Sequence, residues 1–120
     1  FAHQHNVKMG IQLAHAGRKA STMRPVDGRL IALSEDGGWQ AVAPSPIAFF
    51  EYPTPRQLTI SEIKDIVSQF GAAAKRAVLA GFDVIEIHAA HGYLLHQFYS
   101  PLSNQRTDEY GGNFDGRTKF

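Results

Sequence analysis

The sequence has no cysteine among its 120 residues. This absence excludes disulfide bonds and thiolate metal sites within the segment. The sequence also has no apolar run of transmembrane length and no charged-then-apolar leader. We therefore expect a cytoplasmic location and no membrane partner.

An excess of charge of one sign is missing as well. The 12 basic residues nearly balance the 11 acidic ones, which leaves a net charge of +1. This balance gives no electrostatic reason to expect nucleic acid or an anionic membrane as a partner. With 43% hydrophobic and 19% charged residues, the composition is that of a soluble globular protein.

Two segments have the pattern of β-strands. Apolar residues alternate with others along Val7–Ala14, which is the period of two that a strand with two different environments shows. The second segment, Phe82–His88, is a short apolar run directly behind Gly81. We predict a strand over each of these segments.

A helix is predicted between the two strands. Thr59 and Glu62 have the spacing of a capping box, and Gly81 supplies the stop. A strand, a helix and a strand in this order form a βαβ unit, so the strands should be parallel and the crossover right-handed. The apolar residues that recur with helical period are Ile63, Ile66, Val67, Phe70, Ala74, Ala77 and Val78.

The remaining segments are predicted to be irregular or incomplete. Residues 15–58 show little periodicity and contain five prolines, so we expect a long loop after the first strand. Phe1–Asn6 should be the end of an upstream helix and its turn, and Phe120 should lie in the opening of another helix. We therefore expect the chain to be a fragment of a longer protein.

Two histidines and a tyrosine follow the second predicted strand. His88, His91 and Tyr93 would project from its carboxyl end, where parallel α/β folds build active sites. Two imidazoles spaced three residues apart can donate hydrogen bonds to one small acceptor, such as a developing oxyanion. They could equally bind a metal, or be buried polar residues that the backbone satisfies.

Tyr93 and Gln12 each have a functional and a structural interpretation. A phenol is a weak acid that can deliver a proton to carbon, but a buried tyrosine is by default a core aromatic with one hydrogen bond. The amide of Gln12 offers a donor and an acceptor side by side, although an internal glutamine usually bonds to neighbouring backbone. Because the two strands are parallel, Gln12, His88, His91 and Tyr93 could converge on one pocket.

Two blocks of the sequence resemble a known family. The block EIHAAHGYLLHQFYSPLSNQRTDEYGG, from Glu86 to Gly112, and the block IQLAHAGRKAS, from Ile11 to Ser21, are similar to those of the old yellow enzyme family of flavin-dependent ene-reductases. The paired histidines and the glutamine resemble the xenobiotic-reductase and thermophilic-like branch of that family.

The resemblance implies the fold class. Family members are (β/α)8 TIM barrels, which need about 250 residues to close, so 120 residues supply about two consecutive β-α units with a long βα loop. We expect residues 1–120 to be part of a single (β/α)8 flavin-binding barrel domain, with both barrel termini missing.

The resemblance also implies a reaction. NADPH or NADH would reduce a bound FMN, and the enzyme would then reduce the activated C=C bond of an enone, and also nitro compounds. By resemblance, His88 and His91 bind the substrate oxygen, and Tyr93 donates the proton to the α-carbon. In this family we also expect a homo-oligomer.

Gln12 is the one FMN contact that the resemblance assigns within this chain. The family's phosphate contacts lie on strands beyond Phe120, so Arg18, Arg106 and Arg117 are not assigned to FMN. His15 would border the flavin pocket. No metal is expected.

A polar network is predicted after the histidine pair. Asn104, Arg106, Asp108 and Tyr110 look like a set that locks a loop. The family usually has Asn where this chain has Gly116, and this difference puts the capping of the next helix in doubt.

Two alternatives stay open at the level of sequence. Glu86, His88, His91 and His96 could belong to a metal-dependent hydrolase on the same scaffold, although no full ligand set is visible. The chain could also be a non-catalytic remnant in which the histidines only stabilise a loop.

Overall fold

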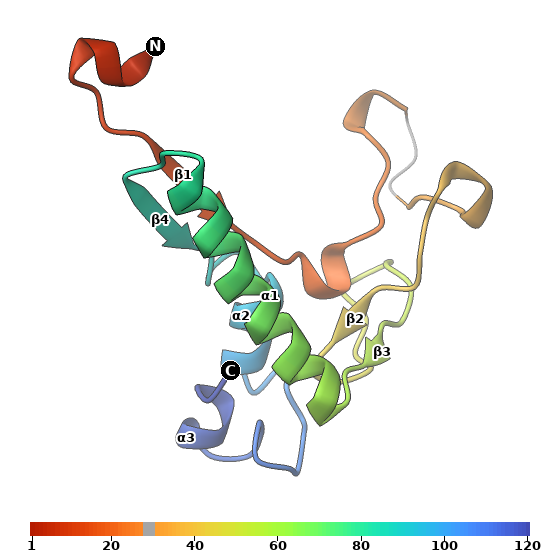
Figure 1. The fold of residues 1–120 in the computed structure, drawn as a ribbon. Helices are drawn as coiled ribbons and strands as arrows, with labels where there is room; N and C mark the ends of the chain where they lie inside the picture. The colour runs from red at the N-terminus through yellow and green to blue at the C-terminus, as the bar shows by residue number, and fades with distance from the viewer. Residues whose placement is uncertain (28–30) are drawn as a thin grey trace. The chain divides into compact units, whose positions relative to one another are not determined.

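A computed structural model describes residues 1–27 and 31–120 of the chain (Figure 1). The chain divides into two compact units. We call the first the strand unit, which comprises Phe1–Ala14 and Thr59–His88. We call the second the loop unit, which comprises His15–Leu58 and Ala89–Phe120.

Two short parallel strands form the sheet of the strand unit. Strand β1 (Gly10–Leu13) lies beside β4 (Val84–Ile87), with Gly10 opposite Val84 and Leu13 opposite Ile87 (Figure 1). The predicted parallel arrangement is confirmed. A 3-10 helix, η1 (Ala2–His5), precedes β1 and ends at Asn6 in the left-handed conformation, where the sequence predicted a helix end and its turn.

Both strands are shorter than the sequence predicted, and Asp83 is the physical reason at their starts. Its carboxylate accepts a hydrogen bond of 3.0 Å from the Met9 N–H, which takes the place of a bond to a neighbouring strand. The side chains of Lys8 and His3 also bond this carboxylate, at 2.9 and 2.7 Å. These three contacts, the Met9 N–H first, hold the pKa of Asp83 well below its usual range.

Helix α1 (Ile60–Leu79) connects the two strands, as predicted. Its capping box is present: the Glu62 N–H donates to Thr59 Oγ1 at 3.2 Å, and the Thr59 N–H donates to Glu62 Oε2 at 2.8 Å. After the helix, Gly81 takes a φ of 92°, which a residue with a side chain rarely adopts. Local sequence signals therefore set both ends of α1.

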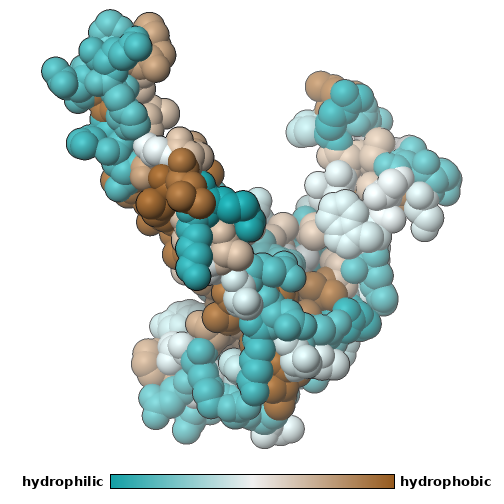
Figure 2. Space-filling view, in the orientation of Figure 1, coloured by the Kyte–Doolittle hydropathy of each residue, from teal (hydrophilic) through white to brown (hydrophobic). Residues whose placement is uncertain are grey.

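Apolar side chains of the strand unit remain exposed. Ile63, Ile66 and Ala77 are buried, but Val78 is 61% exposed and Val84 is 57% exposed. Brown, apolar atoms gather over the β1–β4 pair in Figure 2. Two strands leave the apolar faces of a βαβ unit largely uncovered.

The first half of the loop unit is irregular, which confirms the predicted long loop. It contains the 3-10 helices η2 (Gly17–Lys19), η3 (Pro25–Asp27) and η4 (Ser34–Asp36). A parallel pair that the sequence did not predict joins β2 (Val42–Ala43) to β3 (Arg56–Gln57). Strands of two residues are too short to show a period, so no sequence pattern marks them.

The second half of the loop unit contains two short helices. Helix α2 (Leu94–Tyr99) buries Leu94 and Phe98 completely. Helix α3 (Phe114–Arg117) ends before Phe120, so the prediction that Phe120 lies in the opening of a helix is wrong. The Phe120 ring instead stacks on Phe98 with 4.4 Å between ring centroids, and this packing fixes its place.

The doubt about helix capping at α3 is resolved by Asn113. Its Oδ1 accepts a hydrogen bond of 2.9 Å from the Gly116 N–H, which caps the helix. A Cβ at Gly116 would lie 2.0 Å from the Gly111 carbonyl oxygen. The backbone of this chain therefore approaches itself too closely at Gly116 for any side chain.

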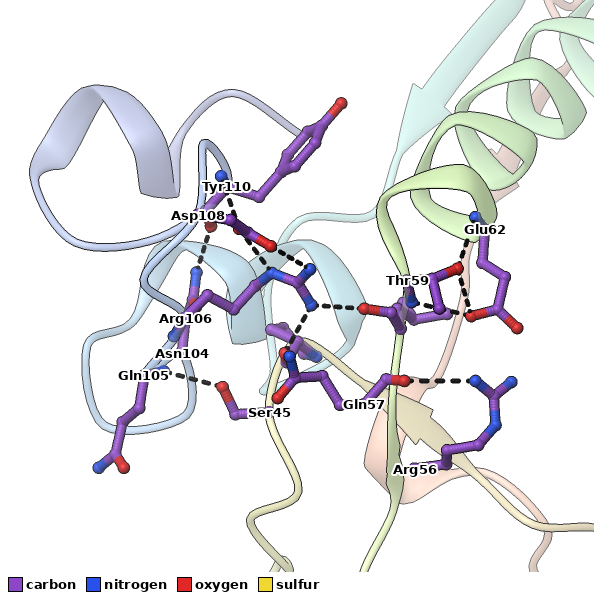
Figure 3. A network of polar contacts seen from close by, with 12 residues as sticks. Ser45, Arg56, Gln57, Thr59, Glu62, Asn104, Gln105, Arg106, Asp108 and Tyr110 are labelled. Atoms are coloured by element: carbon purple, nitrogen blue, oxygen red, sulfur yellow. Dashed lines mark hydrogen bonds and ion pairs between the residues drawn. The ribbon is translucent and has the colours of Figure 1, made fainter.

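The predicted loop-locking network is present (Figure 3). The buried guanidinium of Arg106 forms a double hydrogen bond with the Asp108 carboxylate, at 2.9 and 2.6 Å. It also donates to the backbone carbonyls of Pro44 and Leu58, at 2.9 and 2.6 Å. The hydrogen bonds from Arg106 hold the pKa of Asp108 below its usual value.

Asn104 supplies the rest of this network. Its Nδ2 donates to the carbonyls of Phe98 and Tyr110, at 2.7 and 2.8 Å, and its Oδ1 accepts from the Arg106 N–H at 3.1 Å. The segments around α2, β2 and the 104–110 turn are thereby held together.

No helix in residues 1–27 and 31–120 is both long and apolar enough to cross a membrane.

Candidate active site

Gln12 lies on β1 directly opposite Glu86 on β4. Its Nε2 donates a hydrogen bond of 3.0 Å to Glu86 Oε1. Both side chains are exposed. The amide of Gln12 therefore bonds a side chain of the neighbouring strand. The alternative interpretation of Gln12, as an internal glutamine, predicted a bond to neighbouring backbone.

His88 comes directly after β4. Its backbone N–H donates to the Leu13 carbonyl at 2.9 Å, which continues the ladder one residue beyond the strand. The residue is buried, with 8% of its surface exposed. Because β1 and β4 are parallel, their carboxyl ends lie at one edge, and the structure brings Gln12 and His88 to that edge.

His91 and Tyr93 belong to a tight turn of the loop unit. His91 has a φ of 55° and Gly92 a φ of 69°, so two successive residues are in the left-handed region. For a residue with a Cβ this conformation costs about 1–2 kcal/mol. The Tyr93 N–H donates to the Ala90 carbonyl at 3.1 Å, and Tyr93 is the N-cap residue of α2.

Three side chains bond the backbone of this turn. Lys19 Nζ donates to the His91 carbonyl at 2.7 Å, and Gln97 Nε2 donates to the Gly92 carbonyl at 2.7 Å. The Gly92 N–H donates to His96 Nδ1 at 2.8 Å. These contacts stabilise a backbone conformation that is unfavourable for His91 on its own.

Sequence reasoning missed Lys19, His96 and Gln97. His96 was considered only for the metal-dependent alternative, and the other two were not singled out. One signal was available for Gln97, because it is a polar residue next to Phe98 in the apolar run LLHQFY. Gln97 is 1% exposed.

His15 is part of the loop unit and bonds the start of α2. Its carbonyl accepts from the Leu94 N–H at 2.9 Å, and its Nδ1 accepts from the Gly17 N–H at 3.0 Å. Burial lowers the pKa of His15, and a backbone hydrogen bond opposes this effect. Its predicted place beside a flavin stays a prediction.

The three arginines that were not assigned to FMN all bond backbone carbonyls. Arg18 Nη1 donates to Ile47 and Ala48, at 3.0 Å each, and burial lowers the pKa of Arg18. Arg117 Nε donates to the Tyr99 carbonyl at 2.9 Å. Together with the network around Arg106, these contacts give each arginine a structural role.

The metal-dependent alternative gains no support from the described part of the chain. Within residues 1–27 and 31–120, no group of three or more His, Asp or Glu side chains is placed to hold a metal ion. His3, one of the remaining histidines, bonds Asp83 in the strand unit.

The predicted site residues are therefore divided between the two units. Gln12 and His88 lie in the strand unit, and His91 and Tyr93 lie in the loop unit. The convergence of all four on one pocket stays a prediction.

Comparison with known proteins gives a family match over almost the whole chain. Residues 2–120 match the model of the NADH:flavin oxidoreductase / NADH oxidase family. The chain is 57% identical to an NADH:flavin oxidoreductase of Gibberella zeae, over 99% of this chain and 30% of that protein. It is 53% identical to an NADPH dehydrogenase of Bacillus subtilis, over 94% of this chain and 29% of that protein.

Solved structures show the same likeness. A morphinone reductase in complex with tetrahydroNAD matches 98% of this chain with a TM-score of 0.78 and 33% sequence identity, and the match covers 34% of that chain. The predicted fold class, a fragment of a (β/α)8 barrel, is confirmed. The chain spans about 30% of the length of the curated relatives that it matches.

Proposed function

Because the chain belongs to the NADH:flavin oxidoreductase / NADH oxidase family, we propose that it forms part of an FMN-dependent enzyme that reduces activated C=C bonds with NADPH or NADH. Enones are the proposed substrate class, and nitro compounds are a second class. The nicotinamide-type ligand bound to the related morphinone reductase supports a nicotinamide reductant.

Gln12 is the residue of this chain that fits FMN. Its exposed carboxamide lies near the carboxyl edge of β1 and offers a donor and an acceptor, which complement the imide-like edge of the flavin ring. Bound FMN supplies the hydride chemistry, which no side chain can perform. Gln12 would hold and orient the ring.

His88 and His91 bind the substrate oxygen in this proposal. Imidazole N–H groups that point at the carbonyl or nitro oxygen stabilise the negative charge that develops there during reduction. Burial of His88 favours this role, because hydrogen bonds are stronger where water is excluded. The same pair would accept the carboxamide of the nicotinamide.

Tyr93 donates the proton to the α-carbon of the substrate. A phenol can act as a general acid when it lies within hydrogen-bond reach of the reacting carbon. The structural support is its place at the start of α2, in the turn that also carries His91.

One observation carries the proposal. Buried His88 directly follows a strand of a parallel pair, and the chain then continues into a restrained turn that presents His91 and Tyr93. The unfavourable backbone conformation of His91 supports a functional role for this turn, because such residues cluster at active sites.

The test uses the full-length protein. We expect a yellow preparation whose visible spectrum is that of bound FMN, which NADPH or NADH bleaches anaerobically and cyclohexenone restores. A preparation that stays colourless with added FMN would overturn the proposal.

Homo-oligomeric assembly and a cytoplasmic location stay predictions, which gel filtration and cell fractionation would test.

A further inference from the structure

Gln97 is a fully satisfied carboxamide in the middle of the loop unit. Its Nε2 donates to the carbonyls of Gly92 and Ala16, at 2.7 and 3.2 Å, and its Oε1 accepts from the Arg18 N–H at 3.2 Å. With 1% exposure, water cannot replace these bonds. Gln97 therefore ties the turn after His91 to a segment about 80 residues earlier in the sequence.

The segment around Gly17 is shaped to receive this side chain. Gly17 has a φ of 59°, and a Cβ at this position would lie 2.3 Å from Gln97 Oε1. The backbone of the 16–18 segment thus packs directly against the amide plane. The rotamer of Gln97 is fixed by this close approach as well as by its hydrogen bonds.

We propose that Gln97 is a positioning residue for the reaction, which fixes His91 and Tyr93 through the Gly92 carbonyl. This inference rests on the proposed function. Gly92 lies between the two side chains and shares the left-handed conformation with His91. Without the bond from Gln97, the strained turn loses one of its three side-chain contacts and can relax, and both side chains move with it.

Asn104 provides a matched control in the same unit. It is also a buried carboxamide, at 4% exposure, with two donor bonds to carbonyls and one acceptor bond from a backbone N–H. Its partners are Phe98, Tyr110 and Arg106, and none of them lies in the 91–93 turn. Loss of its donors should therefore affect stability without affecting the turn directly.

The experiment compares Gln97→Glu with Asn104→Asp in the FMN-loaded full-length enzyme. Each substitution keeps the size of the side chain and the acceptor oxygen but removes the two N–H donors. The readouts are the thermal midpoint, the affinity for a para-substituted phenol from its long-wavelength absorption with the flavin, and the separate kcat and KM for cyclohexenone.

We expect both substitutions to lower the thermal midpoint. Only Gln97→Glu should weaken phenol binding, by about tenfold or more, and raise KM for the enone, because only this variant removes a contact that holds the turn. If Gln97→Glu does not retain flavin, Gln97→Met and Asn104→Leu form the second pair, which removes the hydrogen bonds without introducing a charge.

Two results would overturn the inference. One is an unchanged phenol affinity in the Gln97 variants, and the other is an equal loss in the Asn104 variants, which would make the effect one of general stability. His91→Ala, measured in the same titration, separates this inference from the proposed function. If His91→Ala also binds phenol normally, the proposed substrate site itself is wrong.

Discussion

Gln12 and Glu86 oppose each other in the register of the parallel strands, and their side chains are joined by a hydrogen bond of 3.0 Å. The Gln12 amide is thus held from one side by a carboxylate before any ligand binds. A donor that is held in place in advance loses less conformational freedom when it binds a ligand.

The first prediction concerns this residue. Gln12→Leu should weaken FMN binding by about tenfold, because one or two hydrogen bonds of about 1 kcal/mol each are lost. Fluorescence titration of the flavin-free full-length enzyme with FMN measures this change. Gln69→Leu, an exposed substitution on α1, is the control and should leave the affinity unchanged. Equal affinities of the two variants for FMN would contradict the assignment of Gln12.

The second prediction concerns the substrate oxygen. His91→Ala should weaken the binding of para-substituted phenols, which mimic that oxygen as phenolates, by about 10- to 100-fold. The change follows from the loss of a hydrogen bond to a charged acceptor. Titration of the long-wavelength absorption of the flavin–phenol complex measures it, and His5→Ala in η1 is the control. If both variants bind phenol as the unaltered enzyme does, His91 has no part in substrate binding.

The third prediction separates proton donation from binding. Tyr93→Phe removes the acidic proton and keeps the ring, so oxidation of the reduced enzyme by cyclohexenone should slow by about a hundredfold. Reduction of the enzyme by NADPH needs no proton from Tyr93 and should keep its rate. Stopped-flow absorbance resolves the two half-reactions. Tyr99→Phe, at a half-exposed position on α2, should change neither rate. Slower reduction with normal reoxidation would argue against the role of Tyr93.

Local signals allowed the sequence to predict α1 almost completely. Thr59 and Glu62 are only three residues apart and bond each other, so the helix start depends on nothing distant. The strands were located but predicted too long. Their true starting points depend on the Asp83 carboxylate, which reaches the Met9 N–H from 74 residues away in the sequence.

The candidate site also has one part that the sequence predicts and one part that it does not. The position of His88 at the end of a strand follows from the apolar run before it, and this part could be predicted. The restrained turn at His91 could not, because its conformation depends on Lys19, a partner 72 residues earlier in the sequence. The role of Gln97 likewise becomes visible only through its bond to Ala16. Contacts between distant segments leave no periodic trace in a sequence.

The fourth prediction concerns the buried guanidinium of Arg106. Arg106→Leu removes the guanidinium that bonds the Asp108 carboxylate and two backbone carbonyls, although the Tyr110 N–H still donates to the carboxylate, so the free energy of unfolding should fall by about 3–5 kcal/mol. Arg24→Leu removes an exposed pair with Asp27 and should cost less than about 1 kcal/mol. Urea unfolding of the full-length enzyme, followed by far-UV circular dichroism, compares the two. Similar losses would show that the Arg106 network does not stabilise the fold.

The last prediction is a pH dependence that comes from His15. Burial lowers the pKa of its imidazole in the folded state, whereas the unfolded chain has the ordinary value of 6.5. Protons therefore bind the unfolded state more readily, so the stability that neutral His15 provides is complete above about pH 6.5 and is lost as the pH falls through the folded pKa. Protonation at Nδ1 would also remove the acceptor of the Gly17 N–H.

His15→Asn places an uncharged acceptor oxygen near the same position. We expect the thermal midpoint of the unaltered enzyme to fall more between pH 7.5 and pH 5.5 than that of His15→Asn, with His5→Ala behaving like the unaltered enzyme. A fall of equal size in all three proteins would show that the titration of His15 is not coupled to folding.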